Sequence, residues 1–331
     1  MLIKDIGEQG LLKILQKFCP PEIVGDDCAV LPTNPHQSLA VTTDMLVDGV
    51  HFSDRTTGPY YAGWRAAAAN LSDLAAMGAK PLAVTVALAV AADTAVDWVE
   101  DFYRGMTACL QEYHTPIAGG DVVRSPVVTI SITAFGQVEE NRTIRRSNAR
   151  SNWAIVATGF HGASRAGLEL LLNPEFGKNL TKGDRTSLIL AHQRPKPRLD
   201  VLPFLWEILD AAGEFAIAGM DSSDGLADAI VQVCRASGVG AKVDRMKIPI
   251  PHSLSEIVST QKALDWALYG GEDFELVLFL PIDRAKLLVE RIGDGSAIVG
   301  ITTECADIWL SDSSGICPDF RLEIDRGFQH F

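Results

Sequence analysis

Six aspartates lie in short, non-repetitive stretches, and they restrict the folds that this chain can adopt. They are Asp27, Asp44, Asp73, Asp121, Asp221 and Asp224. Two carboxylates about 4 Å apart repel by roughly 4 kcal/mol at an effective dielectric constant of about 20. A fold that brings such groups together therefore needs a compensating cation. Mg²⁺ fits this role, because it prefers a few carboxylates together with the phosphates of a substrate.

Segments typical of strands alternate with segments typical of helices along the chain. β-branched content or alternation predicts strands at 39–43, 83–90, 127–136, 153–158 and 274–280. Apolar periodicity predicts helices at 1–18, 60–77, 94–113, 164–172, 184–192, 200–211 and 224–237. Thr94 is a candidate N-cap, and the first helix should bury Ile3, Ile6, Leu11, Leu12 and Leu15. The pattern predicts an α/β (α+β) fold.

The length of the chain favours two domains. At 331 residues, 47% of them hydrophobic, the chain is too long for one ordinary core and has enough apolar residues for two. The segment 142–152 is polar and basic without apolar periodicity, so we place the boundary there, near residue 148. This predicts an N-terminal domain over 1–148 and a C-terminal α/β domain over 149–331.

Charge and cysteine content argue against several classes of protein. The net charge of −13 argues against a nucleic-acid partner, because such binding requires a basic face. The six cysteines include no Cys-x-x-Cys pair, which indicates reduced thiols rather than disulfides or a zinc site. The N-terminus carries charges where a signal peptide would be apolar, and no run of about 18 apolar residues occurs. We therefore expect a cytoplasmic protein without a membrane span.

Three aspartate motifs in the first half of the chain indicate phosphate or metal binding, and they do so with different strength. Asp44 and the preceding Thr42 and Thr43 follow an apolar stretch, so they should emerge at the carboxyl end of a strand, where open α/β sheets bind ligands. A hydroxyl beside a carboxylate also suits Mg²⁺. By contrast, Asp27 and Asp121 lie in the glycine-containing stretches 25–27 and 119–121, which also fit ordinary turns. The glycines before Asp121 could instead bring backbone amides close to a phosphate.

The remaining acids also have structural alternatives. Asp73 lies in a predicted helix with Asn70 on the same face, where an unpaired buried acid would be costly, although the acid could face solvent. The segment 221–225 precedes a predicted helix, and its side chains could either cap that helix or hold an anion. Glu272 lies in a glycine turn that enters a strand, where acids can be plain edge charges. His51 is a lone histidine, a residue type that can be structural or can contact a substrate.

In their order and spacing, these motifs resemble those of thiamine-monophosphate kinases, a family in the aminoimidazole ribonucleotide synthetase superfamily. The resemblance spans nearly the whole chain, and its most specific parts are Asn70–Ala79 and Gly270–Leu276. It implies the two-domain fold of that superfamily and a homodimer whose N-terminal sheets pair. It also implies Mg²⁺-dependent transfer of the γ-phosphoryl group of ATP to thiamine monophosphate, in the biosynthesis of thiamine diphosphate.

The resemblance implies roles for individual residues. Metal-binding positions are matched by Asp27, Thr42, Thr43, Asp44, Asp73, Asp121, Asp221 and Asp224. Positions that contact ATP are matched by Tyr103, Gly120, Asp121, Arg146 and Ser223. Positions that contact thiamine monophosphate are matched by His51, Glu272 and Phe328. One departure is visible, because the segment 148–153 lacks the Gly-Asp that commonly opens the second domain. This should alter a linker turn and leave the chemistry intact.

The implied reaction needs no general base. The acceptor is a phosphate monoester with a second pKa of about 6, so its attacking oxygen is largely deprotonated at pH 7. The barrier comes from bringing two polyanions together, and catalysis should consist of positioning and charge neutralisation around an in-line transfer. We expect several Mg²⁺ ions and the guanidinium of Arg146 to neutralise this charge.

Rival functions would require signatures that this sequence does not show. A selenophosphate synthetase would need a cysteine or selenocysteine beside a lysine in a glycine-rich loop, and Cys19 has no such context. A hydrogenase-maturation dehydratase would end in a reactive cysteine, whereas this sequence ends in Phe331. Aminoimidazole ribonucleotide synthetase itself would not be expected to carry the Gly270–Leu276 signature. A non-catalytic metal-binding scaffold would carry a repeated acidic loop like the EF-hand, and none is present.

Overall fold

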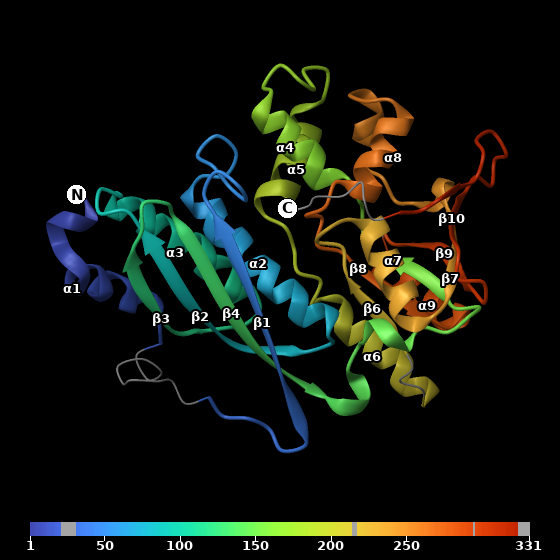
Figure 1. The fold of residues 1–331 in the computed structure, drawn as a ribbon, viewed down its shortest axis with the longest axis horizontal. Helices are drawn as coiled ribbons and strands as arrows, with labels where there is room; N and C mark the ends of the chain where they lie inside the picture. Colours follow the sequence, from blue (N-terminus) through green and yellow to red (C-terminus); the bar gives the residue numbers. More distant parts are fainter. Residues whose placement is uncertain (21–30, 214–216, 294, 324–331) are drawn as a thin grey trace. The chain divides into compact units, whose positions relative to one another are not determined.

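The computed structural model describes residues 1–20, 31–213, 217–293 and 295–323 (Figure 1). By its internal contacts the chain forms two compact units. Unit 1 comprises Met1–Leu74 and Ala79–Glu140, and unit 2 comprises Ala75–Gly78 and Asn141–Phe331. This division falls just before the polar segment 142–152 on which the sequence-based boundary rests.

Unit 1 contains a four-stranded sheet in the order β1-β4-β2-β3. The bounds are Gln37–Val47 for β1, Lys80–Val90 for β2, Ile117–Arg124 for β3 and Thr129–Glu139 for β4. β4 pairs antiparallel with both β1 and β2, whereas β3 runs parallel to β2. The predicted strands at 39–43, 83–90 and 127–136 overlap β1, β2 and β4 and are confirmed. The turn suggested before Asp121 is wrong, because this residue lies inside β3.

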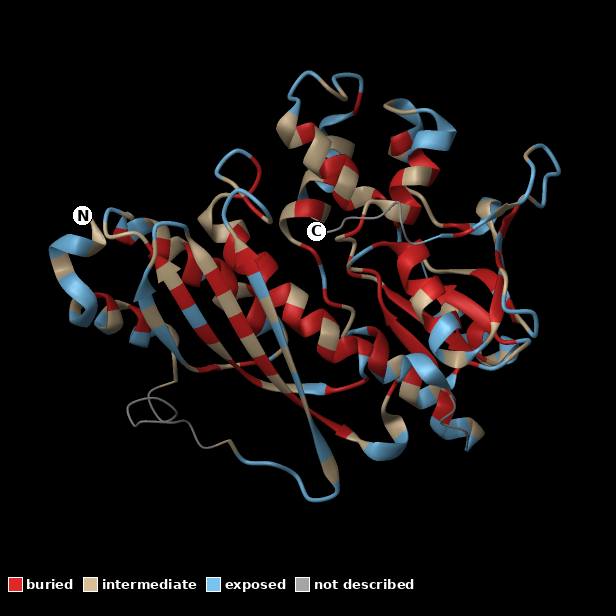
Figure 2. Ribbon diagram, viewed as in Figure 1, coloured by how far each residue is buried: buried red, intermediate tan, exposed pale blue. Residues whose placement is uncertain are grey.

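The two faces of this sheet differ in burial. On one face, alternate residues of β4 such as Ile130 and Ile132 are buried, as are Val86 and Leu88 of β2. The helices α2 (Pro59–Ala76) and α3 (Val96–Glu112) cover this face (Figure 1). The other face carries the exposed apolar residues Leu39, Val41 and Met45 of β1, a strand on which Figure 2 shows many exposed positions. We call these the inner face and the outer face of the sheet.

α2 and α3 approach each other closely through two glycines. A Cβ atom on Gly63 of α2 would lie 1.9 Å from the carbonyl oxygen of Phe102 on α3. A Cβ atom on Gly105 of α3 would lie 1.7 Å from the carbonyl oxygen of Tyr60 on α2. Contacts this short cannot form, so glycine is required on both helices at this crossing. Because the two backbones are in contact, the position of α2 relative to α3 is closely fixed.

The N-terminal part of unit 1 differs in two details from the sequence-based expectation. α1 (Ile3–Leu15) has non-helical backbone at Gly7, and it buries Leu11 and Leu15, whereas Ile3, Ile6 and Leu12 are only half-buried. The prediction of Thr94 as an N-cap is also wrong. The N-cap of α3 is Ala95, which makes no side-chain capping bond. The carbonyl of Thr94 instead accepts a hydrogen bond from the Ile3 amide at 3.0 Å.

Unit 2 contains a seven-stranded sheet in the order β11-β10-β7-β9-β5-β8-β6. The strands are β5 (Ala154–Ala157), β6 (Ala218–Asp221), β7 (Gly240–Asp244), β8 (Leu276–Leu280), β9 (Ala297–Thr303), β10 (Ile308–Ser311) and β11 (Phe320–Arg321). The predicted strands at 153–158 and 274–280 overlap β5 and β8 and are confirmed. All residues of β5, β6 and β8 are buried, so this part of the sheet forms the centre of the unit.

Six α-helices of unit 2 lie within the described part of the chain. They are α4 (Ala163–Leu172), α5 (Lys182–Gln193), α6 (Val201–Ala212), α7 (Leu226–Ser237), α8 (Thr260–Tyr269) and α9 (Ile282–Ile292). The first four confirm the predicted helices, whereas α8 and α9 were not predicted. Residues of α7 and α8 share one hydrophobic cluster with the sheet, and residues of α6 and α9 share another. Short 3₁₀ turns occur at Gln16–Phe18, Glu140–Arg142, Arg146–Asn148, Arg245–Lys247 and His252–Glu256.

Two further features concern the helices and the cysteines. In the part of the chain that the structure describes, none of the helices is long and apolar enough to cross a membrane. The described cysteines, which are Cys19, Cys109, Cys234, Cys305 and Cys317, form no disulfide with one another.

Candidate active site

On unit 1, β1 and α2 bring together four polar side chains that the sequence singled out. Thr42 and Asp44 alternate with exposed residues along β1 and lie on its inner face, which α2 covers. The hydroxyl of Thr42 donates a hydrogen bond to the carboxylate of Asp73 on α2. The side-chain oxygen of Asn70, which is fully buried, accepts a hydrogen bond of 3.2 Å from the amide of Asp44. Asp73 is therefore joined to β1 and is not simply a solvent-facing acid.

Thr43 does not join this group through its side chain. Successive side chains of a strand point to opposite faces, so Thr43 lies on the outer face. There its hydroxyl shares a hydrogen bond of 2.8 Å with the hydroxyl of Thr133 on β4. His51 follows β1 in a turn, and its Nδ1 accepts a hydrogen bond of 3.1 Å from the amide of Val47. The ring proton of neutral His51 therefore lies on Nε2.

Asp121 lies at a distance from the Asp44 group. The strand register aligns Asp44 with Ile132, Val86 and Gly120, one residue on each strand. Three strand spacings therefore separate Asp44 from Gly120, and their backbones lie about 14 Å apart. Asp121 pairs with the exposed Ala87 and belongs to the outer face, opposite to Asp44. Asp121 and Asp44 therefore cannot bind the same ion within one copy of unit 1.

Glycine at position 120 is explained by the pairing of β2 with β3. A Cβ atom on Gly120 would lie 2.0 Å from the carbonyl oxygen of Val86. Any larger residue would push β3 away from the sheet. The carboxylate of Asp121 accepts a hydrogen bond of 2.9 Å from the amide of Val122. Gly120 therefore fixes where β3 places this acid.

The chemistry of these donors fits Mg²⁺. Carboxylate and hydroxyl oxygens are the hard ligands that this ion prefers, and it commonly keeps one or two carboxylates with waters and substrate phosphates. Across the described ranges, no three His, Cys, Asp or Glu side chains come close enough together to hold a metal ion by themselves. The described acids thus fit a site that a phosphate completes better than an all-protein cage. Asp27 lies outside the described residues.

Tyr103 lies in the interior of unit 1. It is 4% exposed, and its ring packs against Phe18 and Phe102 with centroid separations of 5.4 and 5.5 Å. Burial raises the pKa of the Tyr103 phenol well above its usual range.

On unit 2, a second group forms where β6 ends. Asp221, the last residue of β6, is buried, and one of its carboxylate oxygens accepts a hydrogen bond of 3.1 Å from the hydroxyl of Ser223. Asp224 is exposed in the turn that follows. Gly225 is the N-cap of α7 and makes no side-chain capping bond. Neither aspartate therefore serves as the N-cap residue of this helix.

The glycine loop Gly270–Glu275 is tied to this turn. The amide of Glu272 donates to the carbonyl oxygen of Ser223 at 2.6 Å, and the amide of Ser222 donates to the carbonyl oxygen of Glu275 at 2.8 Å. A Cβ atom on Gly271, which has a φ of 66°, would lie 2.8 Å from the carbonyl oxygen of Ser223. The two segments therefore move as one piece.

His161 contacts the turn that follows β6 through Ser222, and the sequence did not identify this residue. It is fully buried, and its Nδ1 lies 3.0 Å from the carbonyl oxygen of Gly159, which can only accept. Nδ1 therefore carries the proton, and Nε2 accepts from the hydroxyl of Ser222 at 3.1 Å. Burial lowers the pKa of His161 to about 4, and the bond to Gly159 acts in the opposite direction. His161 is thus neutral at pH 7.

Two acids of the glycine loop also point inward. The carboxylate of Asp273 accepts hydrogen bonds from the amides of Gly162 at 2.7 Å and Ser164 at 2.9 Å, at the start of α4. Desolvation raises the pKa of Asp273 to about 7, whereas the two amide donors act to lower it. Glu275 accepts from the hydroxyl of Thr158 at 2.7 Å and forms an ion pair with Arg198. Burial raises the pKa of Glu275 despite this partner.

The side chain of Glu272 remains partly exposed, beside a buried histidine. One of its carboxylate oxygens lies 3.7 Å from Nδ1 of His192, and that nitrogen lies 3.2 Å from the hydroxyl of Ser164. Arg146 lies in a 3₁₀ turn, and its guanidinium donates to the side-chain oxygen of Gln232 on α7. Phe328, the third predicted contact of the acceptor, lies outside the described residues.

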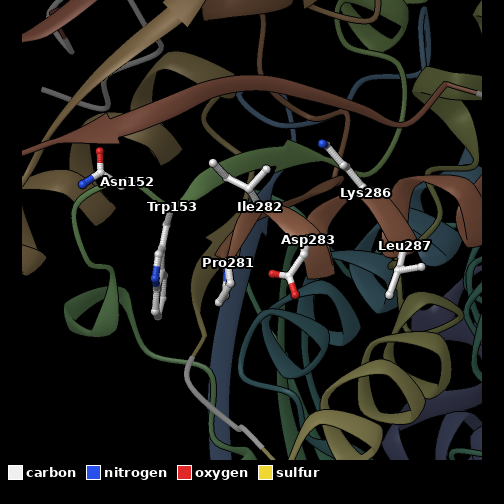
Figure 3. Close-up of a pocket in the computed structure, with 7 residues that line it drawn as sticks. All are labelled: Asn152, Trp153, Pro281, Ile282, Asp283, Lys286 and Leu287. Atoms are coloured by element: carbon white, nitrogen blue, oxygen red, sulfur yellow. The ribbon is translucent and has the colours of Figure 1, made fainter.

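A pocket in unit 2 does not contain any of the predicted site residues. It is lined by Asn152, Trp153, Pro281, Ile282, Asp283, Lys286 and Leu287. Figure 3 shows Trp153 beside Pro281. Pro281 follows the carboxyl end of β8, whereas the glycine loop precedes its amino end. This pocket therefore lies at the opposite end of β8 from the glycine loop.

Comparisons with known proteins concern both the sequence and the fold. The family model "AIR synthase related protein, N-terminal domain" matches residues 25–138. The thiamine-monophosphate kinase of Synechococcus elongatus is 49% identical over 331 residues, which cover 99% of this chain and 98% of that protein. The identity extends over both units and is not confined to the acidic motifs.

Two solved structures are similar to this fold over nearly their whole length. The thiamine-monophosphate kinase of Stenotrophomonas maltophilia K279a has a TM-score of 0.77 and 31% identity, covering 92% of this chain and 95% of that one. A structure described as "AaThiL complexed with AMPPCP and TMP" has a TM-score of 0.73 and 29% identity, covering 97% of this chain and 98% of that one.

Proposed function

This chain belongs to the thiamine-monophosphate kinase family, and we infer that it transfers the γ-phosphoryl group of ATP to thiamine monophosphate. The products are thiamine diphosphate and ADP. The observation that carries this conclusion is the identity to the Synechococcus kinase along both whole chains. The similarity to a structure complexed with AMPPCP and TMP supports the same two substrates.

We propose that Mg²⁺ supports this transfer through the acids of unit 1. Thr42, Asp44 and Asp73 form one group on the inner face, and Asp121 lies apart on the outer face. Within one copy of unit 1 these two locations cannot share an ion, so we propose several ions. Bound Mg²⁺ would neutralise phosphate charge. The carboxylates would hold the ions, and Asn70 would keep the backbone of Asp44 in place.

Unit 2 supplies the remaining proposed contacts. Ser223 and Arg146 would bind ATP, Asp221 and Asp224 would bind metal, and Glu272 would bind the cationic acceptor. The negative charge of Glu272 complements a thiazolium ring. The proposal is supported by the bond between Ser223 and Asp221 and the bond between Glu272 and Ser223, which join three of these residues. No side chain is needed to deprotonate the acceptor, because its phosphate is already ionised at pH 7.

We also propose a homodimer formed by the outer face of the unit 1 sheet. Leu39, Val41 and Met45 of β1 are 55 to 57% exposed and lie on this face. β1 is also an edge strand, and an exposed apolar edge is a liability that a partner can cover. Thr43 and Asp121 lie on the same face, so pairing of two copies would place them in or beside the interface. A cytoplasmic location agrees with the absence of disulfides among the described cysteines.

One assay tests the reaction. Purified protein is mixed with ATP, Mg²⁺ and thiamine monophosphate, and both ADP and thiamine diphosphate are quantified. We expect the two products in equal amounts, and none when unphosphorylated thiamine replaces the monophosphate. ADP without thiamine diphosphate, or no ADP at all, would overturn the proposed function.

A further inference from the structure

The glycine loop has an unusual backbone. Glu272 and Phe274 have φ values of 60° and 53°, and Gly271 has a φ of 66°. Residues other than glycine are uncommon in this left-handed region. Such conformations persist only where the surrounding structure determines them, and they are concentrated at functional sites. Asp273 lies between the two unusual residues, so its contacts help to impose this shape.

Asp273 fixes the loop to the start of α4 through both carboxylate oxygens. Oδ2 accepts from the amide of Gly162 at 2.7 Å, and Oδ1 accepts from the amide of Ser164 at 2.9 Å. Gly162 is the N-cap of α4 and has no side chain to cap the helix. A carboxylate at a helix N-terminus is favoured by the helix dipole and by charge-assisted hydrogen bonds. Asp273 therefore serves as the cap that α4 lacks in its own sequence.

This anchor affects two proposed binding residues, Glu272 and Ser223. Glu272 precedes Asp273 directly, so the anchor sets the direction of its side chain. The amide of Glu272 also donates to the carbonyl oxygen of Ser223 at 2.6 Å, and the amide of Glu275 donates to the hydroxyl of Ser222 at 3.2 Å. A displacement of the loop would therefore displace the turn at residues 221–224.

We propose that Asp273 is a positioning residue of the kinase, which holds the Glu272 carboxylate and the turn at residues 221–224 in a fixed relation by anchoring the glycine loop to α4. The inference rests on the proposed function, because that function assigns Glu272 to thiamine monophosphate and Ser223 to ATP. Asp273 itself contacts backbone amides and no proposed substrate group.

The test is Asp273→Asn, which keeps the size of the side chain but replaces one accepting oxygen by an NH₂ group facing an amide donor. We expect the KM for thiamine monophosphate to rise about tenfold or more, with a smaller rise in the KM for ATP. The matched control is Asp184→Asn. Asp184 also lies in the first turn of a helix of unit 2, where its carboxylate accepts from the hydroxyl of Thr181 at 2.6 Å. The control should lose thermal stability without a change in either KM.

A second variant and a second measurement separate positioning from folding. Asp273→Glu keeps the carboxyl group and both oxygens, so it should recover part of the affinity lost in Asp273→Asn. Hydrogen exchange in Asp273→Asn should speed up in segments 159–164, 221–225 and 270–276. Unchanged KM values with a lowered melting temperature would overturn the proposal, as would failure of both Asp273 variants to fold. If the wild-type protein itself makes no thiamine diphosphate, the proposed function fails and not the anchor, which the exchange measurement tests separately.

Discussion

The hydroxyl of Thr42 on β1 donates a hydrogen bond to the carboxylate of Asp73 on α2. This bond joins residues 31 positions apart, and it orients an acid that the kinase needs for metal binding in our proposal. Such an acid must present its remaining lone pairs in a fixed direction.

Replacement of Thr42 by valine should loosen Asp73 without changing the shape of the core. We expect the Mg²⁺ concentration for half-maximal rate to rise several-fold, and the free energy of unfolding to fall by about 1 kcal/mol. Initial rates of ADP formation over a range of Mg²⁺ concentrations measure the first effect. Thr42→Ser retains the hydroxyl and should behave like the wild type. The same Mg²⁺ dependence in the valine variant would contradict a role for this bond.

Asp44→Asn should lower kcat by about 100-fold or more, because a metal ligand that acts in the transition state is lost. The amide of residue 44 still reaches Asn70, so the fold should be retained. Turnover and the melting temperature are measured together. Asp93→Asn, which changes an exposed acid in the segment after β2, is the control and should be fully active. Near-normal activity of Asp44→Asn would remove Asp44 from the metal ligands.

Added Mg²⁺ should raise the thermal stability, since it relieves carboxylate repulsion and binds the folded state. The gain should be about 1 kcal/mol per site at roughly five times the Kd. Thermal unfolding is followed with and without Mg²⁺, with NaCl at equal ionic strength as the control. The shift should shrink in Asp44→Asn. An unchanged melting temperature at millimolar Mg²⁺, with and without ATP, argues against a metal site in the folded protein.

His161 should make the protein sensitive to mild acid. Its folded-state pKa of about 4 lies below the usual 6.5, so the unfolded chain binds its proton first as the pH falls. Its contribution is fully present above about pH 6.5 and is lost as the pH falls towards 4, by roughly 3 kcal/mol in total. Asp273 and Glu275, with raised pKa values, act in the opposite direction.

A variant isolates this contribution. In His161→Asn the side-chain amide can still donate to Gly159, but no proton is taken up in this pH range. The free energy of unfolding in urea is compared at pH 7 and pH 5 for both proteins. The wild type should lose about 2 kcal/mol more than the variant over this interval. Equal losses would show that His161 does not titrate as its burial indicates.

Val41→Asp should break the proposed dimer. Val41 is 56% exposed on the outer face of β1, and a charge there would be buried by a partner sheet at a high cost. Light scattering after size exclusion should give about one chain mass of 35.7 kDa for the variant and twice that for the wild type. Ile316→Asp, at a residue of unit 2 that is 84% exposed, should leave the mass unchanged. A monomeric wild type would contradict the proposal directly.

The sequence predicted the long elements and missed those with weak or short patterns. β1 and β4 carry 11 residues each with clear alternation, so their side-chain period is readable. β3 contains two glycines and lies at a sheet edge, and its composition is typical of a turn. β6 has only 4 residues, all buried, so no alternation marks it. α8 was missed although Ser259 caps it by accepting from the amide of Lys262.

For the site, residue types were easier to predict than the direction of side chains. Because side chains alternate along β1, Thr43 is expected on the opposite face of the sheet from Thr42 and Asp44. The face of Asp121 depends on an irregular register between β2 and β3 at Thr85, and nothing in the local sequence indicates it. His161 gave no signal, because its role comes from burial beneath a segment 61 positions away. Asp273 lay within a recognised motif, but its partners on α4 are 109 and 111 positions distant.

The reciprocal contact of Gly63 and Gly105 restricts how this family member can diverge. A side chain added on either helix would strike main-chain atoms of the other, so no compensating substitution at the contacted residue can make room. At ordinary core contacts, a larger side chain can be accommodated when its neighbour is replaced by a smaller one. At this crossing the contacted atoms belong to the main chain, so no such compensation exists. Alanine at either site should therefore be poorly tolerated in a saturation library, and substitutions at the contacted residues should not restore function.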